Sequence, residues 1–187
     1  MFKLAIVGLD TSHAIKFTEL IQGEERIIET LQVTRCLRFP SAFQSEEDQN
    51  KRQEILEQLG VVVTHSFEEA VKEVNGILLE INDPVLHLEY FEKVSELGLP
   101  VFLDKPLADN LKNGLKIFNL AKEKDLKVCS SSSLRFTPEI RSCVAEISSP
   151  VFCNVYGPLG KAASGNSLIW YGVHTFEMLM TLMGKGA

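Results

Sequence analysis

The feature that most constrains the fold is a regular alternation of short apolar segments with longer, more polar ones. The apolar segments are short, continuous and rich in β-branched residues, as buried strands are. They span 3–9, 31–39, 60–65, 76–81, 99–106 and 126–133. The intervening segments carry helical spacing or helix caps, at 12–30, 45–59, 66–74, 82–98 and 109–124. Because crossovers of helix length join parallel strands, the sequence predicts an α/β fold with a doubly wound parallel sheet.

Capping residues mark several of the expected helix ends. Ser66, followed three residues later by Glu69, has the pattern of a capping box at the start of a short helix. Pro84 is typical of the first turn of the helix expected over 82–98. The first helix is expected to break at Gly23.

The alternation stops after about residue 136. Residues 149–158 look like one more strand, and 168–183 look like an apolar helix that ends at Gly184. A strand, a loop and a helix cannot enclose a core of their own. We therefore expect one complete domain over 1–136 and, over 137–187, the start of a truncated α+β second domain.

The last helix bears on assembly. If the second domain is incomplete, this helix exposes apolar residues such as Leu179 and Met183. Exposed apolar patches usually mark a surface that a partner covers. The sequence therefore predicts self-association into a homo-oligomer.

Charge and composition exclude several classes of partner. The formal net charge is −6 and no basic run occurs, which argues against nucleic acid. No apolar stretch approaches the ~20 residues that cross a bilayer. The N-terminus enters the first strand without a signal peptide, so we expect a cytoplasmic protein with no membrane partner. The four cysteines form no CxxC pair and have no histidine at zinc-site spacing, so reduced structural thiols are expected.

The loop after the first strand reads GLDTSH. A glycine and small polar residues before a helix are typical of a Rossmann-like, dinucleotide-binding domain, which normally has three such glycines. Gly8 supplies the first, whereas Asp10 and His13 stand where the others would be. Thr11, Ser12 and His13 can still donate to a phosphate at the helix N-terminus. We therefore assign Gly8, Asp10, Thr11, Ser12 and His13 to a cofactor site. Alternatively, Asp10 or Ser12 caps the helix.

Charged residues follow two other strands, at the edge where parallel sheets bind ligands. Arg38 ends the second strand where NAD-binding domains usually carry an acidic residue. It could meet the 2′-phosphate of NADP, or it could be a surface charge. Lys105 follows the fifth strand with Asp104 beside it, and we assign both to the cofactor site. Lys105 is also a candidate for proton transfer, the alternative being a solvated lysine at a turn.

His174 is the remaining candidate for chemistry. It lies in the last apolar helix, with Glu177 three residues later on the same face. A lone histidine in such a helix is more often a core residue than a functional one. This motif alone therefore leaves both interpretations open.

Five segments occur together in order: KLAIVGLD, INDPVLH, VFLDKPLA, SLRFTPEI and GVHTFEMLMTLMG. Together they resemble the Gfo/Idh/MocA family of oxidoreductases over nearly the whole chain. The resemblance implies an N-terminal dinucleotide-binding domain and a C-terminal α/β domain through which many members assemble. It also implies NAD or NADP as cofactor, and hydride transfer to or from a hydroxyl or carbonyl of a sugar- or polyol-like substrate.

The resemblance also implies roles for individual residues. Lys105, in DKP, matches the lysine of the family's EKP motif, which contacts substrate and cofactor and assists proton transfer. Pro84 and His87 match a P-x-x-H segment beside the nicotinamide ribose, and we add the adjacent Asn82 to this cofactor-binding set. His174 matches the histidine that acts as acid or base at the substrate carbon. Lys105 and His174 are thus the expected catalytic pair.

Departures from the family pattern leave other hypotheses open. Trp170 replaces the aspartate four residues before the histidine, the first loop has one glycine, and the second strand lacks an acidic end. Trp170 and the short chain favour a non-catalytic ligand-binding or regulatory relative. A third alternative is metal-dependent chemistry with Asp10, His13 and His174 or His87 as ligands. No metal is among the cofactors that the sequence predicts.

Overall fold

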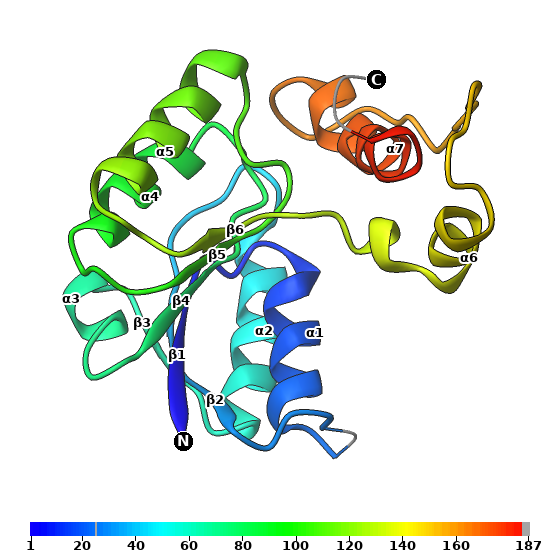
Figure 1. The fold of residues 1–187 in the computed structure, drawn as a ribbon. Coiled ribbons are helices and arrows are strands. Elements are labelled where there is room, and N and C mark those ends of the chain that lie inside the picture. The colour runs from blue at the N-terminus through cyan, green and yellow to red at the C-terminus, as the bar shows by residue number, and fades with distance from the viewer. Residues whose placement is uncertain (25, 185–187) are drawn as a thin grey trace.

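The structure, a computed structural model, describes residues 1–24 and 26–184 (Figure 1). Six strands form one sheet in the order β3-β2-β1-β4-β5-β6, and all neighbouring pairs are parallel. The strands are β1 Phe2–Val7, β2 Leu31–Leu37, β3 Val62–Thr64, β4 Gly76–Leu79, β5 Val101–Leu103 and β6 Val128–Cys129. The predicted doubly wound parallel sheet is confirmed.

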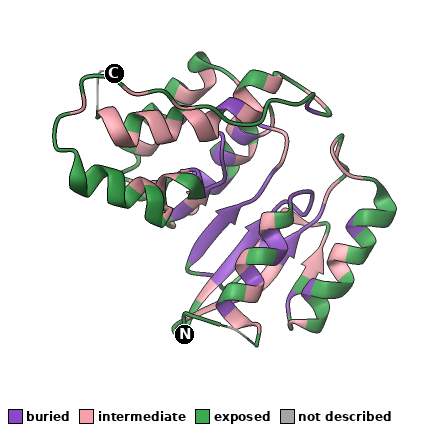
Figure 2. Ribbon diagram, turned by 90° about the vertical axis from the view of Figure 1, so that its right-hand side faces the viewer, coloured by how far each residue is buried: buried purple, intermediate pink, exposed green. Residues whose placement is uncertain are grey.

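Helices cover both faces of the sheet (Figure 1). One face carries α1 Ser12–Gln22 and α2 Glu46–Gln58, and the other carries α3 Phe67–Ala70, α4 His87–Ser95 and α5 Leu111–Glu123. Successive strand residues point to opposite faces. Accordingly Leu4 and Ile6 pack against the α1–α2 layer, whereas Ala5 and Val7 pack in the α3–α5 layer. The central strands β1, β4 and β5 are therefore among the most buried parts of the chain (Figure 2).

The helix ends follow local hydrogen bonding. Ser66 caps α3 with its side chain, as predicted, and α1 breaks at Gly23, also as predicted. The helix α4 begins later than the sequence suggested, at His87. The side chain of Asp83 accepts the backbone N–H of Val85 at 3.1 Å and holds a turn ahead of the helix.

β1 and β4 are neighbours in the sheet, yet the helices that follow them lie on opposite faces. Such a switch point opens a crevice at the carboxyl ends of the strands, where ligands bind in this fold class. At Gly8 the chain leaves β1 with φ of 108°, a conformation that favours glycine. A Cβ at this position would lie 2.2 Å from the carbonyl oxygen of Glu80. The loop after β1 therefore passes very close to the end of β4.

Beyond β6 the chain leaves the sheet. It forms a 3₁₀ turn, Ser133–Phe136, and two helices, α6 Pro138–Glu146 and α7 Ser167–Met183. Among the described residues, none of this part belongs to either of the two buried clusters that flank the sheet. The expected end of the last helix at Gly184 is confirmed.

The strand expected at 149–158 is wrong, since the described residues form no strand there. Val151, Phe152 and Tyr156 are instead 99%, 80% and 87% exposed. A strand needs a neighbouring strand edge for its hydrogen bonds, and no edge of the sheet pairs with this segment. A high β propensity alone is therefore not enough to make this segment a strand.

The helix α7 lies beyond the carboxyl end of the sheet (Figure 1). It exposes apolar residues as expected, but these are Leu168, Phe176 and Met180. The two residues that we named, Leu179 and Met183, are partly buried. Leu179 faces the chain segment 153–159, which lies along this side of α7.

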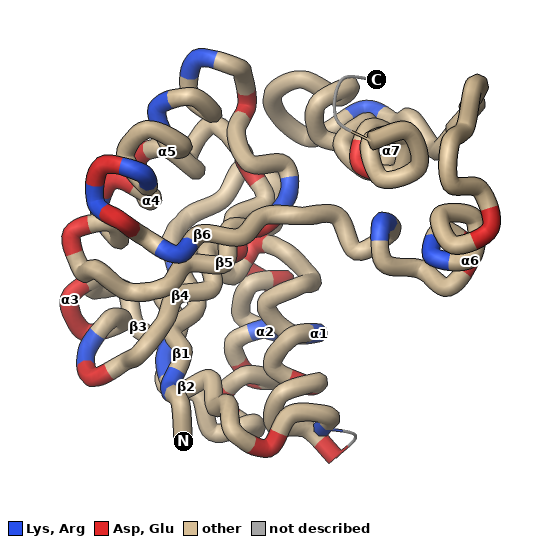
Figure 3. The backbone as a smooth tube through the Cα atoms, in the orientation of Figure 1, with Lys and Arg blue, Asp and Glu red and all other residues tan. Residues whose placement is uncertain are grey.

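Charged residues of both signs are interspersed along the helices (Figure 3). Lys93 and Glu89 on α4, for example, form an ion pair of 2.7 Å at i,i+4 spacing. Surface pairs of this kind contribute little to stability. None of the described helices has both the length and the apolar character needed to traverse a bilayer.

Candidate active site at the carboxyl edge of the sheet

A cavity of about 400 Å³ lies at the carboxyl edge of the sheet, between α1, the end of β5 and α7. Its volume is in the range of small-molecule sites, about 300–1,000 Å³. Its walls are His13, Lys16, Phe17, Phe102, Asp104, Lys105, Ser131, Ser133, Phe136 and His174. The structure therefore brings the two expected catalytic residues, Lys105 and His174, to one cavity from distant parts of the sequence.

Lys105 is held where β5 ends. The N–H of Asp104 donates to the carbonyl of Leu79 at 3.0 Å, which continues the sheet by one residue. Lys105 follows with its own N–H bonded to the Asp104 carboxylate at 2.8 Å. Its ammonium lies 4.9 Å from the centroid of the Trp170 ring, close enough for a cation–π contact. The residue is only 8% exposed, so the alternative of a solvated turn lysine is wrong.

His13 and Asp104 form a pair on the cavity wall. The Nδ1 atom of His13 lies 2.8 Å from the Asp104 carboxylate, whose side chain is 3% exposed. His13 belongs to the first turn of α1, and its N–H donates to the side chain of Thr11, the N-cap. The pair therefore ties the start of α1 to the end of β5.

His174 reaches the cavity from α7. Its Nδ1 atom lies 2.6 Å from the hydroxyl of Ser132, which also accepts the N–H of Leu134. Burial lowers the pKa of His174, and the charge of Lys105 lowers it further, while Asp104 opposes the shift. The ring is therefore neutral near pH 7, a state suited to exchanging a proton with a ligand.

Asp10 does not cap α1; this alternative is wrong for both Asp10 and Ser12, because Thr11 is the N-cap. The Asp10 carboxylate accepts the N–H of Asn82 at 2.9 Å and the hydroxyl of Ser41 at 2.6 Å. Burial raises the pKa of Asp10, against the effect of these hydrogen bonds. Its role in the structure is to join the loop after β1 to the loop after β4.

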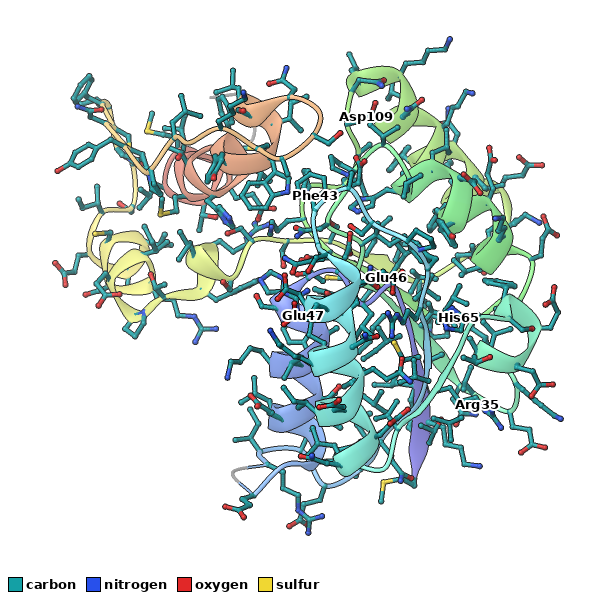
Figure 4. The ribbon with its side chains drawn as sticks, turned by 180° about the vertical axis from the view of Figure 1, so that it is seen from behind. Arg35, Phe43, Glu46, Glu47, His65 and Asp109 are labelled. Carbon is teal, nitrogen blue, oxygen red and sulfur yellow. The ribbon has the colours of Figure 1, made fainter. Side chains whose placement is uncertain are left out.

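Arg38 is buried, so a simple surface charge is excluded. Its guanidinium donates to Gln53 at 2.8 Å and pairs with Glu46 at the start of α2, which Figure 4 labels. Neither partner of Arg38 could be predicted from the residue pattern. A 2′-phosphate would have to compete with Glu46 for the guanidinium.

The segment with Asn82, Pro84 and His87 forms the loop after β4. Asn82 donates its side-chain amide to the carbonyl of Asp10 at 3.1 Å, and the Pro84 carbonyl accepts the N–H of His87. His87 is fully buried, with Nε2 at 2.7 Å from the carbonyl of Ile81, and burial lowers its pKa. These residues fix the shape of the loop, and His87 has no exposed edge to offer a ligand.

Glu80 is a site residue that the sequence reasoning missed. It follows β4 directly, is fully buried, and finds no hydrogen-bond partner for either carboxylate oxygen among the described residues. Burial and the charge of Asp104 raise the pKa of Glu80 well above its ordinary value, while Lys105 opposes the shift. A charged residue inside the apolar run GILLEI was the signal that could have found it.

Trp170 has a role that its place in the pattern did not indicate. Its indole N–H donates to the carbonyl of Asn82 at 3.1 Å, and its ring stacks on Phe43 with centroids 6.0 Å apart. Figure 4 shows Phe43 where the loop before α2 meets α7. Trp170 therefore fixes α7 above the end of β4 and covers Lys105.

The residues at this edge fit a nicotinamide dinucleotide. Ser12 is exposed at the start of α1, where the helix dipole and free N–H groups favour phosphate. The Asp10 carboxylate, which would repel a phosphate, is occupied by Asn82 and Ser41. Lys16 and Lys105 add positive charge to the cavity wall.

Comparisons with known proteins agree with this geometry. A family model described as an oxidoreductase family with an NAD-binding Rossmann fold matches residues 3–132. Among curated proteins, no relative matches the sequence.

Several solved structures share the fold. An NAD-binding protein from Listeria innocua has a TM-score of 0.68 at 20% identity, over 98% of this chain and 55% of its own. A biliverdin reductase from Synechocystis, in complex with biliverdin and NADP⁺, has 0.59 at 20% identity, over 77% and 42%. A mutant 3-ketoreductase from Actinomadura kijaniata, in complex with TDP-benzene and NADP, has 0.62 at 17% identity, over 82% and 44%.

The chain thus spans about half the length of these structures. The family match covers most of the chain and includes the loop after β1, the loop after β4 and Lys105. The chain belongs to the Gfo/Idh/MocA family of oxidoreductases, whose matched domain is an NAD-binding Rossmann fold.

Proposed function

We propose that this chain is the cofactor-binding part of an NAD- or NADP-dependent oxidoreductase that acts on a hydroxyl or carbonyl of a sugar- or polyol-like substrate. The observation that carries the proposal is the meeting of Lys105 and His174 at one cavity beside the start of α1. Two solved structures of this fold, a biliverdin reductase and a 3-ketoreductase, were determined with NADP⁺ or NADP.

The cofactor would lie across the β1–β4 crevice. At the start of α1 the exposed Ser12 would face its pyrophosphate, with Thr11 as the N-cap and His13 beside it. Gly8 allows the close approach of this loop to β4. Asn82 and Lys105 would border the nicotinamide end of the cofactor. Pro84 and the buried His87 would support the loop after β4 from inside the protein. When bound, the nicotinamide supplies or accepts the hydride.

The proton would move through His174. Its Nδ1 atom is bonded to Ser132, so Nε2 remains for a substrate oxygen. Because a serine hydroxyl can donate or accept, Ser132 supports either tautomer of the ring. Nε2 can thus take a proton from a hydroxyl in oxidation or give one to a carbonyl in reduction. Lys105 would hold the same oxygen and stabilise negative charge on it.

Titration with NADH and NADPH tests the proposal, because the chain has one tryptophan, Trp170, beside Lys105. Saturable quenching of its fluorescence, confirmed by calorimetry, is expected for at least one cofactor. Lys105→Ala should weaken binding, whereas Lys112→Ala, an exposed lysine on α5, should not. Absence of saturable binding of both cofactors at millimolar concentration would overturn the proposal.

A non-catalytic ligand-binding relative is the second candidate. The observation that favours it is Trp170, which replaces the family's aspartate and covers Lys105. If Lys105→Ala changes only a binding constant in a protein that shows no turnover, the second candidate holds. If it abolishes a measurable oxidation or reduction, the first holds.

We also propose that residues 137–187 begin a second domain that carries the rest of the substrate site and the contact between subunits. Two observations support this division. The described residues after β6 add nothing to the two cores that flank the sheet, and the chain covers about half of each of these similar structures.

A further inference from the structure

The proposed reaction leaves one buried group without a role, the carboxylate of Glu80. The side chain has no exposed area, and neither oxygen has a hydrogen-bond partner among the described residues. A buried carboxylate with no partner is costly, so such a group takes up a proton, pairs with a cation or binds a metal. A cation bound beside Glu80 would remove the cost of burying this carboxylate.

Two metal-binding side chains lie next to this carboxylate. One ligating atom each of His13, Glu80 and Asp104 lies within 4.8 Å of the other two. They come from the start of α1 and from the residues that follow β4 and β5, so three neighbouring parts of the carboxyl edge converge on one point. This set shares only His13 with the ligands that the sequence suggested.

We propose that His13, Glu80 and Asp104 form a site for one divalent transition-metal ion of the zinc type. One imidazole and two carboxylates are a donor set that Zn²⁺ accepts, and two carboxylates balance its charge. With bonds of ~2.0–2.2 Å, adjacent donor atoms lie roughly 3–3.6 Å apart. The ion would replace the direct contact between His13 and Asp104, now 2.8 Å, and Glu80 would move toward it.

Lys105 also brings a positive charge near these carboxylates, but it does not pair with Glu80 directly. Its ammonium lies over the Trp170 ring at 4.9 Å, and among the described side chains it forms no ion pair with Glu80 or Asp104. The Asp104 carboxylate already bonds to the ring of His13 and accepts the backbone N–H of Lys105. Glu80 therefore remains without a partner although a lysine is close.

The site also has an open side. His13 and Asp104 both line the 400 Å³ cavity, so a fourth ligand of the ion would come from there. Catalytic zinc sites have this form, with three protein ligands and one position for water or substrate. The inference goes beyond the proposed hydride transfer and does not depend on it.

The test measures metal binding without any nicotinamide cofactor. Protein stripped with a chelator is titrated with Zn²⁺ and with Co²⁺ by calorimetry, and bound metal is counted by elemental analysis after dialysis. We expect one equivalent per chain and a higher melting temperature. Glu80→Gln and His13→Ala should each weaken binding by about 100-fold or more, because loss of even an outer-shell partner costs 10–100-fold.

Two controls separate this site from other metal-binding groups. Glu47→Gln removes an exposed carboxylate on α2, 79% exposed, and should leave the affinity unchanged. The cysteines are free, and Cys129 and Cys143 are exposed, so the Co²⁺ spectrum must lack the intense near-ultraviolet band of thiolate ligation.

Circular dichroism establishes that each variant is folded before its affinity is compared. Substoichiometric metal in the parent protein overturns the proposal, as does a thiolate spectrum. The proposal is also overturned if folded Glu80→Gln and His13→Ala bind the metal as tightly as the parent protein does.

Discussion

At the scale of the residue, the site is governed by how each polar group is partnered. Asp10 joins two loops, Arg38 forms an ion pair with Glu46, and His174 is hydrogen-bonded to Ser132. Each of these contacts links parts of the chain that are distant in sequence or separated by a turn. Changing one side chain therefore affects both its chemistry and the position of its partner.

The state of His174 gives a pH-dependent prediction. Its pKa is lowered below 6.5 by burial, and further by Lys105, so the unfolded chain binds this proton more readily than the folded one. The stability that the neutral ring contributes is therefore complete above pH ~6.5 and is lost as the pH falls through the lowered value. The free energy of unfolding should drop less steeply over this range in His174→Gln, measured by denaturant titration. Identical slopes would contradict this.

The same residue gives a prediction for turnover. Removing a general acid or base typically costs about 100- to 10,000-fold in rate. His174→Gln should therefore lower kcat by at least about 100-fold while leaving the affinity for the cofactor close to its original value. The comparison of kcat with the cofactor dissociation constant separates lost proton transfer from a displaced helix, since a displaced α7 would also alter binding.

Gly8 gives a prediction for the first loop. An alanine there would be strained at φ of 108°, and its Cβ would lie 2.2 Å from a backbone oxygen of Glu80. Gly8→Ala should lower the free energy of unfolding by about 2 kcal/mol or more. Gly98→Ala is the matched control, because φ there is 65° but a Cβ meets no atom within 4 Å. Equal losses at both positions would show that the close approach to β4 is unimportant.

At the scale of the element, periodicity predicted the sheet and its helices because the central strands β1 and β4 are largely buried and most helices begin at a side-chain cap. The strand at 149–158 failed because pairing depends on a partner edge, which a single segment cannot reveal. The position of the candidate site was predictable at Lys105, because the carboxyl ends of parallel strands meet at one edge of the sheet. The contacts of Trp170 and Glu80 could not be predicted, because they depend on how α7 docks and on which side chains meet across the sheet.

The docking of α7 depends on few contacts. Trp170 bonds to Asn82, His174 bonds to Ser132, and Glu177 pairs with Arg135 at 3.3 Å, while Gly172 is the only buried residue of α7. Trp170→Ala should therefore speed amide exchange throughout α7 without changing it in β1 or β4. Hydrogen exchange followed by mass spectrometry measures this, with Phe176→Ala, an exposed position on the same helix, as control. Unchanged protection of α7 would contradict the proposed role of Trp170.

At the scale of the whole molecule, apolar surface is concentrated in the part after β6. Phe152 and Phe176 are 80% and 55% exposed, with Val151, Leu168 and Met180 also exposed. Surfaces of this kind favour association. Light scattering should therefore find dimers or larger species, and the double change Phe152→Ser and Phe176→Ser should shift them toward monomer. A monomeric parent protein at high concentration would contradict the expected homo-oligomer.

Hydrogen bonds connect Asn82 to two different parts of the site. Its N–H and side-chain amide are bonded to Asp10, beside the phosphate-facing loop, and its carbonyl is bonded to Trp170 on the helix that carries His174. A molecule that enters the crevice and shifts either loop would strain the hydrogen bond to α7 as well. Under the proposed function, filling of the dinucleotide end and alignment of the His174 imidazole would therefore depend on each other through one asparagine.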